Sequence, residues 1–231
     1  MDDRLAAPDP SRSLIVGLAV VWGLFVFALA TVMLFSALSV RALASYVHGT
    51  GPDASVAVEI SEQLRRFTVG HPTEVPLDSA GVVGMDRAAL DHLLDVRTIV
   101  RLVGVVAAGL GSLLLAVLAW TWFGDGPLLA MSRALRWAGV GVVGTVAVLG
   151  VTVAVGFDRF FVAFHEALFS GGNWMFSADS LLIRTFPEPF WIAAAVGWLG
   201  VVVLCAALML LGSAATGAAA VRRTWSGSSD R

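Results

Sequence analysis

The sequence predicts an all-α integral membrane protein with four transmembrane helices and an extracytoplasmic, partly helical cap. Of its 231 residues, 58% are hydrophobic and only 14% are charged, whereas charged residues usually make up about 25% of a soluble domain. The mean hydropathy of +0.84 agrees with this composition. In addition, four uncharged runs are each long enough to cross a bilayer, which takes about 20 helical residues.

The first uncharged run, residues 14–40, follows a short N-terminal segment, residues 1–13. A cleaved signal peptide is the alternative, because Ala42-Leu43-Ala44 resembles a small-residue cleavage site. The apolar region of a signal peptide is usually only about 7 to 15 residues long, and this run is longer. The run therefore favours an uncleaved transmembrane helix.

Three further uncharged runs predict the remaining spans at residues 102–123, 137–157 and 190–221. They are separated by a short loop, residues 124–136, and by a longer segment, residues 158–189. Each run meets the length needed to cross the hydrocarbon core. The chain would then have four transmembrane helices.

The placement of arginine residues predicts the orientation of these spans. Short arginine-bearing segments remain in the cytoplasm. These arginines are Arg4 and Arg12 before the first run, Arg133 and Arg136 in the short loop, and Arg222 and Arg223 in the tail of residues 222–231. Residues 41–101 and 158–189 would therefore form the extracytoplasmic cap of a multi-pass plasma-membrane protein.

Two parts of the cap are expected to be helical. From residue 54 to residue 67, apolar residues recur at helical spacing with charged residues between them, which predicts an amphipathic helix suited to a membrane surface. The charged residues are Glu59, Glu62, Arg65 and Arg66. Asp86 is a plausible N-cap for a second helix that runs from Arg87 into the second span.

Charge and cysteine content exclude several classes of protein. A formal net charge of −2 gives no indication of nucleic-acid binding. The single cysteine, Cys205, permits neither an internal disulfide nor a cysteine metal cluster. The dipeptide His165-Glu166 begins like a zinc-protease motif, but the second histidine is absent, so we expect no metal and no cofactor.

All four histidines, His48, His71, His92 and His165, fall in the predicted cap. His92 has Asp95 on the same helical face, where a carboxylate can orient an imidazole. If the segment around His165 is helical, Phe161 and Phe169 flank that ring, and their apolar surroundings would keep it neutral, as a general base requires.

A purely structural interpretation of these residues remains open. Histidines at a membrane boundary can serve as amphipathic anchors. Asp95 can pair with Arg97 or Arg101, and the phenylalanines can simply pack at the interface.

Two short segments resemble signatures of a known family. Phe164-His165-Glu166-Ala167-Leu168-Phe169, followed by Gly172-Asn173-Trp174, Asp179, Leu181-Leu182 and Phe186-Pro187, resembles the second outer segment of the lipoprotein intramolecular transacylases, Lit. Residues 90–96, in which His92 precedes Asp95-Val96, are similar to the other signature of that family. One departure is Gly171-Gly172-Asn173, because the family commonly has an acidic residue before the tryptophan.

The resemblance implies an acyl transfer within one lipoprotein molecule. The sn-2 acyl chain of the diacylglyceryl group on the N-terminal cysteine would move to the α-amine of that cysteine, giving a lyso-form lipoprotein. It implies His92 and His165 as the catalytic pair, with Asp95 and Asp179 in supporting, orienting roles. A substrate pocket would be walled by Phe161, Phe164, Phe169, Trp174 and Phe176.

The expected partners are a diacylglyceryl lipoprotein substrate and membrane lipids, with the protein acting as a monomer. An alternative is a non-catalytic membrane module whose outer cap binds a partner. A small transporter or channel is a second alternative, although ion pathways usually carry a charged residue within the spans and these runs contain none.

Overall fold

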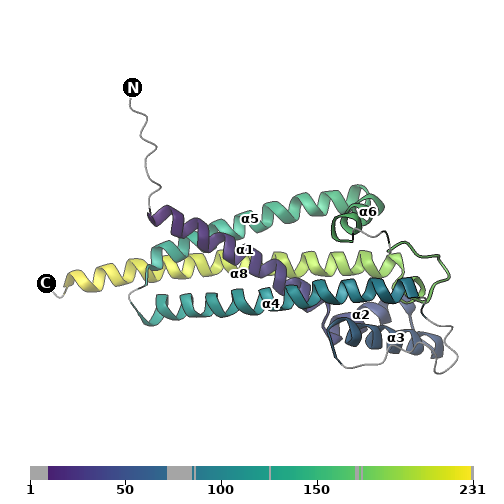
Figure 1. Cartoon of the computed structure of the whole chain (residues 1–231). Helices are drawn as coiled ribbons and strands as arrows, with labels where there is room; N and C mark the ends of the chain where they lie inside the picture. Colours follow the sequence, from purple (N-terminus) through teal and green to yellow (C-terminus); the bar gives the residue numbers. More distant parts are fainter. Residues whose placement is uncertain are drawn as a thin grey trace. The chain divides into compact units, whose positions relative to one another are not determined.

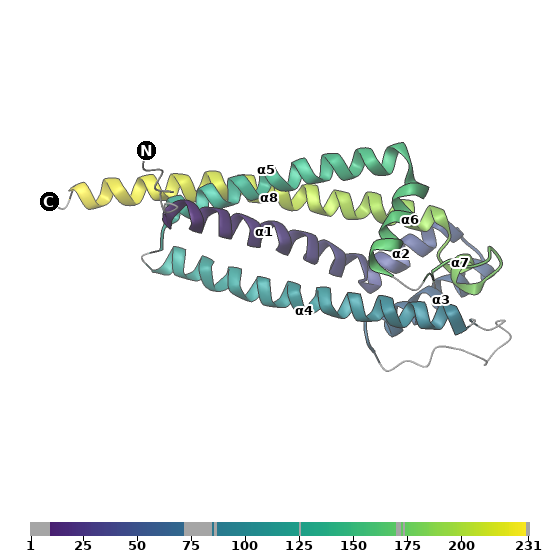
Figure 2. The same ribbon diagram turned by 45° about the horizontal axis from the view of Figure 1, so that its top comes forward.

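The computed structural model describes residues 10–71, 85, 87–124, 126–169, 172 and 174–229. Every regular element in this part of the chain is an α-helix (Figures 1 and 2). The helices are α1 (Pro10–Leu34), α2 (Ala37–His48), α3 (Pro52–Thr68), α4 (Arg87–Phe123), α5 (Leu128–Val155), α6 (Phe157–Leu168), α7 (Leu181–Thr185) and α8 (Glu188–Ser229).

Four of these helices are long and apolar enough to cross a membrane. Their candidate spans are Ser11–Leu34 of α1, Arg87–Phe123 of α4, Leu128–Val155 of α5 and Glu188–Arg223 of α8. The shorter helices α3 and α7 come from the segments predicted to form the cap, while α2 and α6 begin inside predicted spans, at Ala37 and Phe157, and continue into those segments. The predicted fold class, an all-α integral membrane protein with four transmembrane helices, is confirmed.

The first uncharged run is divided between two helices. Helix α1 ends at Leu34, and α2 begins at Ala37. Ser36 caps α2 by accepting a hydrogen bond at 3.2 Å from the backbone N–H of Ser39. The Ser39 hydroxyl in turn donates at 2.7 Å to the carbonyl of Met33. Residues 35–40 are therefore not part of α1, although they are uncharged like the rest of the run.

Helix α4 is one continuous helix of 37 residues. At roughly 1.5 Å per residue it is about 55 Å long, well beyond the roughly 30 Å hydrocarbon core. All of its charged residues lie within residues 87–101, and charge is costly inside hydrocarbon. The charge pattern therefore favours the predicted span, residues 102–123, and a position outside the hydrocarbon for residues 87–101, including His92. The predicted start at Arg87 is confirmed, while Asp86 lies outside the described residues.

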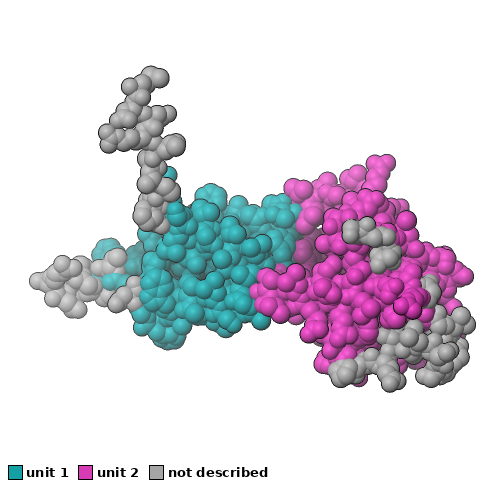
Figure 3. Space-filling model, in the orientation of Figure 1, with its two compact units in different colours: residues 1–27, 107–147, 201–231 teal, residues 28–106, 148–200 magenta. Residues whose placement is uncertain are grey.

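The chain divides into two compact units (Figure 3). Unit 1 consists of Met1–Phe27, Ala107–Ala147 and Val201–Arg231. Within it, glycines allow helices to approach closely: a Cβ on Gly139 would lie 2.9 Å from the Leu210 side chain, and one on Gly111 would lie 3.0 Å from Phe25. Small residues at helix contacts are typical of membrane proteins, where packing replaces the hydrophobic effect.

Unit 2 consists of Ala28–Val106 and Val148–Gly200 and contains the short helices. Its core joins α3, the start of α4 and α7 through a cluster of buried side chains. The cluster comprises Leu64, Met85, Ala89, Leu93 and Leu182, with Ile60, Phe67, Phe176, Leu181 and Phe186 packed against it. Because Leu93 directly follows His92, this cluster fixes the turn of α4 that carries the histidine.

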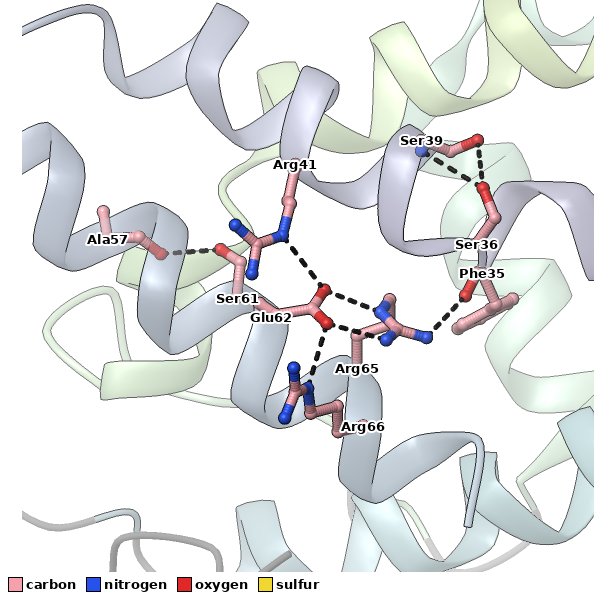
Figure 4. A network of polar contacts seen from close by, with 9 residues as sticks. All are labelled: Phe35, Ser36, Ser39, Arg41, Ala57, Ser61, Glu62, Arg65 and Arg66. Carbon is pink, nitrogen blue, oxygen red and sulfur yellow. Dashed lines mark hydrogen bonds and ion pairs between the residues drawn. The ribbon is translucent and has the colours of Figure 1, made fainter. Parts of the chain in front are cut away.

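Helix α3 is amphipathic, as predicted, but one of its charged residues faces inward. Glu62 is only 2% exposed. Arg65 donates two hydrogen bonds of 2.7 Å to its carboxylate, Arg66 donates one of 3.1 Å, and Arg41 of α2 lies 3.8 Å away (Figure 4). The hydrogen bonds from Arg65 outweigh burial and hold the pKa of Glu62 at about 2. A buried charge is tolerated when it is paired in this way.

The same network ties three elements together. Arg65 also donates at 3.3 Å to the carbonyl of Phe35, the residue after α1, so α3 is joined to the end of the first span. Helices α2 and α3 lie side by side in both ribbon views. At the far end of α2, His48 donates from Nε2 to the carbonyl of Thr185 in α7 at 3.0 Å.

The predicted orientation can be tested with single cysteines in a Cys205→Ala background. Thr50 and Trp225 are both exposed, and they belong to the predicted extracytoplasmic and cytoplasmic segments. In intact cells, Thr50→Cys should label with a membrane-impermeant maleimide and Trp225→Cys should not, because arginine-bearing tails stay inside. Both should label after permeabilisation, and the Cys205→Ala parent should label in neither case. Labelling of Trp225→Cys in intact cells would reverse the assignment.

Candidate active site

His92 and His165 lie next to each other although they come from different helices. His92 is in the polar first part of α4, and His165 is in the last turn of α6. Their ring centroids are 5.9 Å apart and the ring planes are inclined by 30°. Both belong to unit 2. The two imidazoles can therefore contact a single reacting group placed between them, which acid–base chemistry requires.

Four aromatic rings surround His165. The centroid of Phe161 lies 4.0 Å from that of the imidazole, Trp174 lies at 5.1 Å, Phe164 at 5.4 Å and Phe169 at 5.6 Å. The segment is helical as far as Leu168, with Phe169 as its C-cap, so Phe161 and Phe169 flank the histidine as the spacing predicts. These rings replace water around the imidazole with apolar surface.

Phe169 also contacts the second histidine. Its ring packs edge-on against His92 at 4.6 Å, and Phe176 lies 5.7 Å from the same imidazole. His92 and Phe169 are each only 7% exposed. The structure thus brings all five aromatic residues predicted for the pocket against one or both histidines. Their role towards a substrate stays a prediction.

The two predicted supporting carboxylates are placed differently. Asp95 is exposed one turn beyond His92, and its charge acts on that imidazole. Asp179 is exposed in the turn before α7, where a hydrogen bond from Ser177 lowers the pKa of the Asp179 carboxyl. Among the described residues, Asp95 therefore influences His92 through its charge, and Asp179 has no such influence on either histidine.

One hydrogen bond fixes the proton on His165. Its Nδ1 lies 2.8 Å from the carbonyl oxygen of Phe161. Because a carbonyl can only accept, Nδ1 must carry the hydrogen in this arrangement, and the lone pair of the neutral ring is left on Nε2. Burial lowers the pKa of His165, and the hydrogen bond to Phe161 offsets part of that effect. The ring is therefore neutral near pH 7, and its basic nitrogen is Nε2.

His92 is neutral for a related reason. Burial, followed by the nearby His165, lowers the pKa of His92 to about 4, and Asp95 offsets part of the shift. Its Nδ1 is buried and has no hydrogen-bond partner in the described part of the chain. Buried polar atoms without a partner are uncommon and costly. An unpaired nitrogen beside a free basic nitrogen points to a site that binds a polar group.

The other two histidines do not join this pair. His48 is bonded to Thr185, as described above, and His71 is exposed just after α3. Among the described residues, no group of three histidine, cysteine, aspartate or glutamate side chains is arranged to hold a metal ion. The site is therefore a pair of neutral imidazoles within aromatic walls.

Comparisons with known proteins identify the family and the fold. The family model for the lipoprotein intramolecular transacylase Lit matches residues 14–191. The fold is similar to that of the membrane-integral lipoprotein intramolecular transacylase Lit from Bacillus cereus, with a TM-score of 0.68 and 18% identity over 93% of this chain and 97% of the other. A variant of that protein with one histidine replaced by arginine gives a TM-score of 0.61 at 16% identity over 94% of each chain. No curated protein matches the sequence.

The protonation state of His92 can be measured directly. With a pKa of about 4, its imidazole should remain neutral at pH 5.5, where an ordinary histidine is mostly protonated. Long-range ¹H–¹⁵N spectra of histidine-labelled protein in nanodiscs, assigned with His92→Gln, report this state. His165→Gln should raise the pKa of His92, because it removes the positive charge that a protonated His165 places beside His92 at low pH. His71→Gln should leave the pKa of His92 unchanged. An imidazolium signal from His92 at pH 5.5 in the unsubstituted protein would contradict the burial described here.

Proposed function

The chain belongs to the lipoprotein intramolecular transacylase family, Lit, and from that premise we propose which acyl chain it moves and how. The substrate is a lipoprotein whose N-terminal cysteine carries a diacylglyceryl group on sulfur. The sn-2 acyl chain moves from its glyceryl oxygen to the α-amine of the same cysteine. The observation that carries this proposal is the pair of neutral histidines, whose ring centroids are 5.9 Å apart and which are packed against aromatic side chains.

The atoms balance without any co-reactant. The amine nitrogen forms a bond to the acyl carbon, and the bond from that carbon to the sn-2 oxygen breaks. The proton lost by the amine replaces the acyl group on the glyceryl oxygen. The product is an amide and a free hydroxyl on one molecule, so neither water nor an acyl-enzyme is needed.

The hydrogen bond at His165 supports its assignment as the base. An α-amine has a pKa of about 7.7 to 8.0, so near pH 7 much of it is protonated and cannot attack. His165 Nε2 has the free lone pair needed to accept a proton, because Nδ1 is committed to Phe161. A low imidazole pKa keeps that lone pair available.

His92 is then the proton donor to oxygen. A neutral imidazole retains one N–H, which can stabilise the oxyanion that forms on the acyl carbonyl and then protonate the departing glyceryl oxygen. The proton that His165 took from the amine then passes to His92, so both rings return to their neutral forms. A substrate oxygen bound here would satisfy the buried nitrogen that has no partner. Asp95, whose charge favours the protonated form of His92, supports this return of the proton, and we keep Asp179 as an orienting residue of the segment before α7.

The aromatic residues supply position rather than protons. Between the amine and the ester carbonyl the substrate is a flexible chain of single bonds through Cα, Cβ, sulfur and two glyceryl carbons. Holding such a chain in a reactive geometry can lower a barrier by roughly 7 to 11 kcal/mol. Phe161, Phe164, Phe169, Trp174 and Phe176 offer apolar surface for the acyl chain.

We further propose that the enzyme works on the extracytoplasmic side of the plasma membrane as a monomer, taking its substrate from among the membrane lipids. This placement follows from the arginine pattern of the short segments. The chemistry described uses only side chains of this protein.

Mass spectrometry of a lipoprotein N-terminus tests the reaction. In a host without other N-acylation activity, expression of this protein should leave the number of acyl chains unchanged while one chain moves from oxygen to nitrogen. Tandem fragmentation distinguishes the amide from the ester. Gain of an additional chain would indicate transfer from a phospholipid. An unchanged N-terminus would favour a non-catalytic module whose cap binds a partner.

Substitution of the histidines tests the mechanism. His92→Gln and His165→Gln should each reduce turnover by roughly 10²-fold to 10⁴-fold, the range expected for loss of a general acid or base. The double variant should lose much less than the product of the two effects, because the residues act as a unit. His71→Gln is the matched control and should be nearly silent, since that side chain is exposed. Full activity in His165→Gln would eliminate the proposed base.

A further inference from the structure

Two arginines of α4 converge on the end of α3. Arg97 and Arg101 lie one helical turn apart, on the same face of α4. A Cβ on Gly70 would lie 3.6 Å from Cδ of Arg101 and 3.8 Å from Nη2 of Arg97. Gly70 has a φ of +91°, a conformation that L side chains rarely adopt. At these distances a Cβ would make ordinary van der Waals contact, so both arginine side chains lie close to Gly70.

The arginines are held by their packing. The guanidinium carbon of Arg97 lies 5.2 Å from the ring centroid of Phe67, a cation–π contact. Phe67 itself packs against the buried cluster of unit 2. The Arg101 side chain lies close to Gly70. Two like charges are thus brought to one spot by rigid neighbours.

The nearby negative charge does not balance them. In the described part of the chain, neither Arg97 nor Arg101 forms an ion pair with a carboxylate. Glu62, the buried carboxylate of α3, is already shared by Arg41, Arg65 and Arg66. The C-terminus of α3 contributes roughly −0.5 of a charge through its dipole, which attracts the arginines but leaves most of their charge uncompensated.

Their level along α4 identifies the compartment that they face. Arg101 directly precedes residues 102–123, the uncharged spanning segment, and Arg97 lies one turn, about 5.4 Å, farther from it. The polar headgroup layer of a bilayer is roughly 5 to 8 Å deep on each side of the hydrocarbon. With residues 102–123 in the hydrocarbon, the two guanidinium groups are expected at the level of the lipid phosphates.

We propose that Arg97 and Arg101, seated on Phe67 and Gly70, bind the phosphate of an anionic phospholipid and hold the cap against the membrane. Guanidinium groups match phosphate oxygens with two parallel hydrogen bonds each. A lipid with net negative charge, such as phosphatidylglycerol, is favoured because a zwitterionic headgroup brings its own cation to a site that already has two. This lipid is a bound partner of the cap and takes no part in acyl transfer.

Lipid retention by the full-length protein tests the site. Protein equilibrated with equal amounts of phosphatidylglycerol and phosphatidylcholine and then examined by native mass spectrometry should retain phosphatidylglycerol preferentially. Arg97→Gln/Arg101→Gln should lower that retention roughly tenfold or more, as expected for loss of charge-assisted hydrogen bonds. Arg159→Gln/Arg184→Gln removes the same charge from two exposed arginines of unit 2 and should retain the lipid. Arg97→Lys/Arg101→Lys keeps the charge, so its lipid retention should lie between that of Arg97→Gln/Arg101→Gln and that of the control. Intermediate retention would also show that the loss in the glutamine variant comes from the missing charge rather than from misfolding.

Several results would overturn the proposal. These are equal retention of the two lipids by the unsubstituted protein, undiminished retention by Arg97→Gln/Arg101→Gln, or an equal loss in the Arg159→Gln/Arg184→Gln control. Displacement of the lipid by soluble glycerol phosphate would show that the site recognises free phosphate rather than a membrane lipid. Because retention is measured without turnover, the outcome is independent of the acyl-transfer assay.

Discussion

Hydrocarbon solvates neither charges nor unpaired peptide groups, and the arrangement of this protein follows from that constraint. Long uncharged runs satisfy their own backbone groups as α-helices. The ionisable and polar side chains collect beyond the ends of those runs, as on α4, where every charged residue lies ahead of residue 102. The two neighbouring histidines accordingly come from the charged end of α4 and from α6. Since acid–base chemistry needs titratable groups, the proposed reaction would take place beside the hydrocarbon rather than within it.

The short helices around the two histidines are held by a polar network and by an apolar cluster. Glu62 and its three arginines join α2, α3 and the end of α1 through hydrogen bonds. The apolar cluster around Leu64 and Leu93 joins α3 to α4. Phe176 belongs to both regions, because it packs against that cluster and contacts the ring of His92. Loss of packing beneath α3 would therefore also disturb the position of the His92 ring.

The sequence was sufficient for the features that depend on local pattern. Uncharged length predicted the four spans, and helical spacing predicted that Phe161 and Phe169 flank His165. Features set by tertiary contacts were different. The break at Ser36 lies inside an uncharged run, and the burial of Glu62 depends on how α3 packs within unit 2. The proximity of His92 and His165 depends on how α4 and α6 pack, so only the family resemblance could pair them. The hydrogen bond from His165 to Phe161 was foreseeable, since it joins residues one helical turn apart.

Phe169 has a consequence for the fate of the acyl group. Its buried ring touches both imidazoles, so part of the space beside the two rings is bounded by carbon rather than by solvent. In the proposed reaction, an activated ester exposed to water would partition between aminolysis and hydrolysis, and each hydrolytic event would release a fatty acid and leave a lipoprotein with one anchor fewer. Apolar surface beside the proposed base would keep the competing water away at the moment of activation. By limiting hydrolysis in the proposed reaction, the Phe169 ring would leave the lipoprotein product with both acyl chains that anchor it in the membrane.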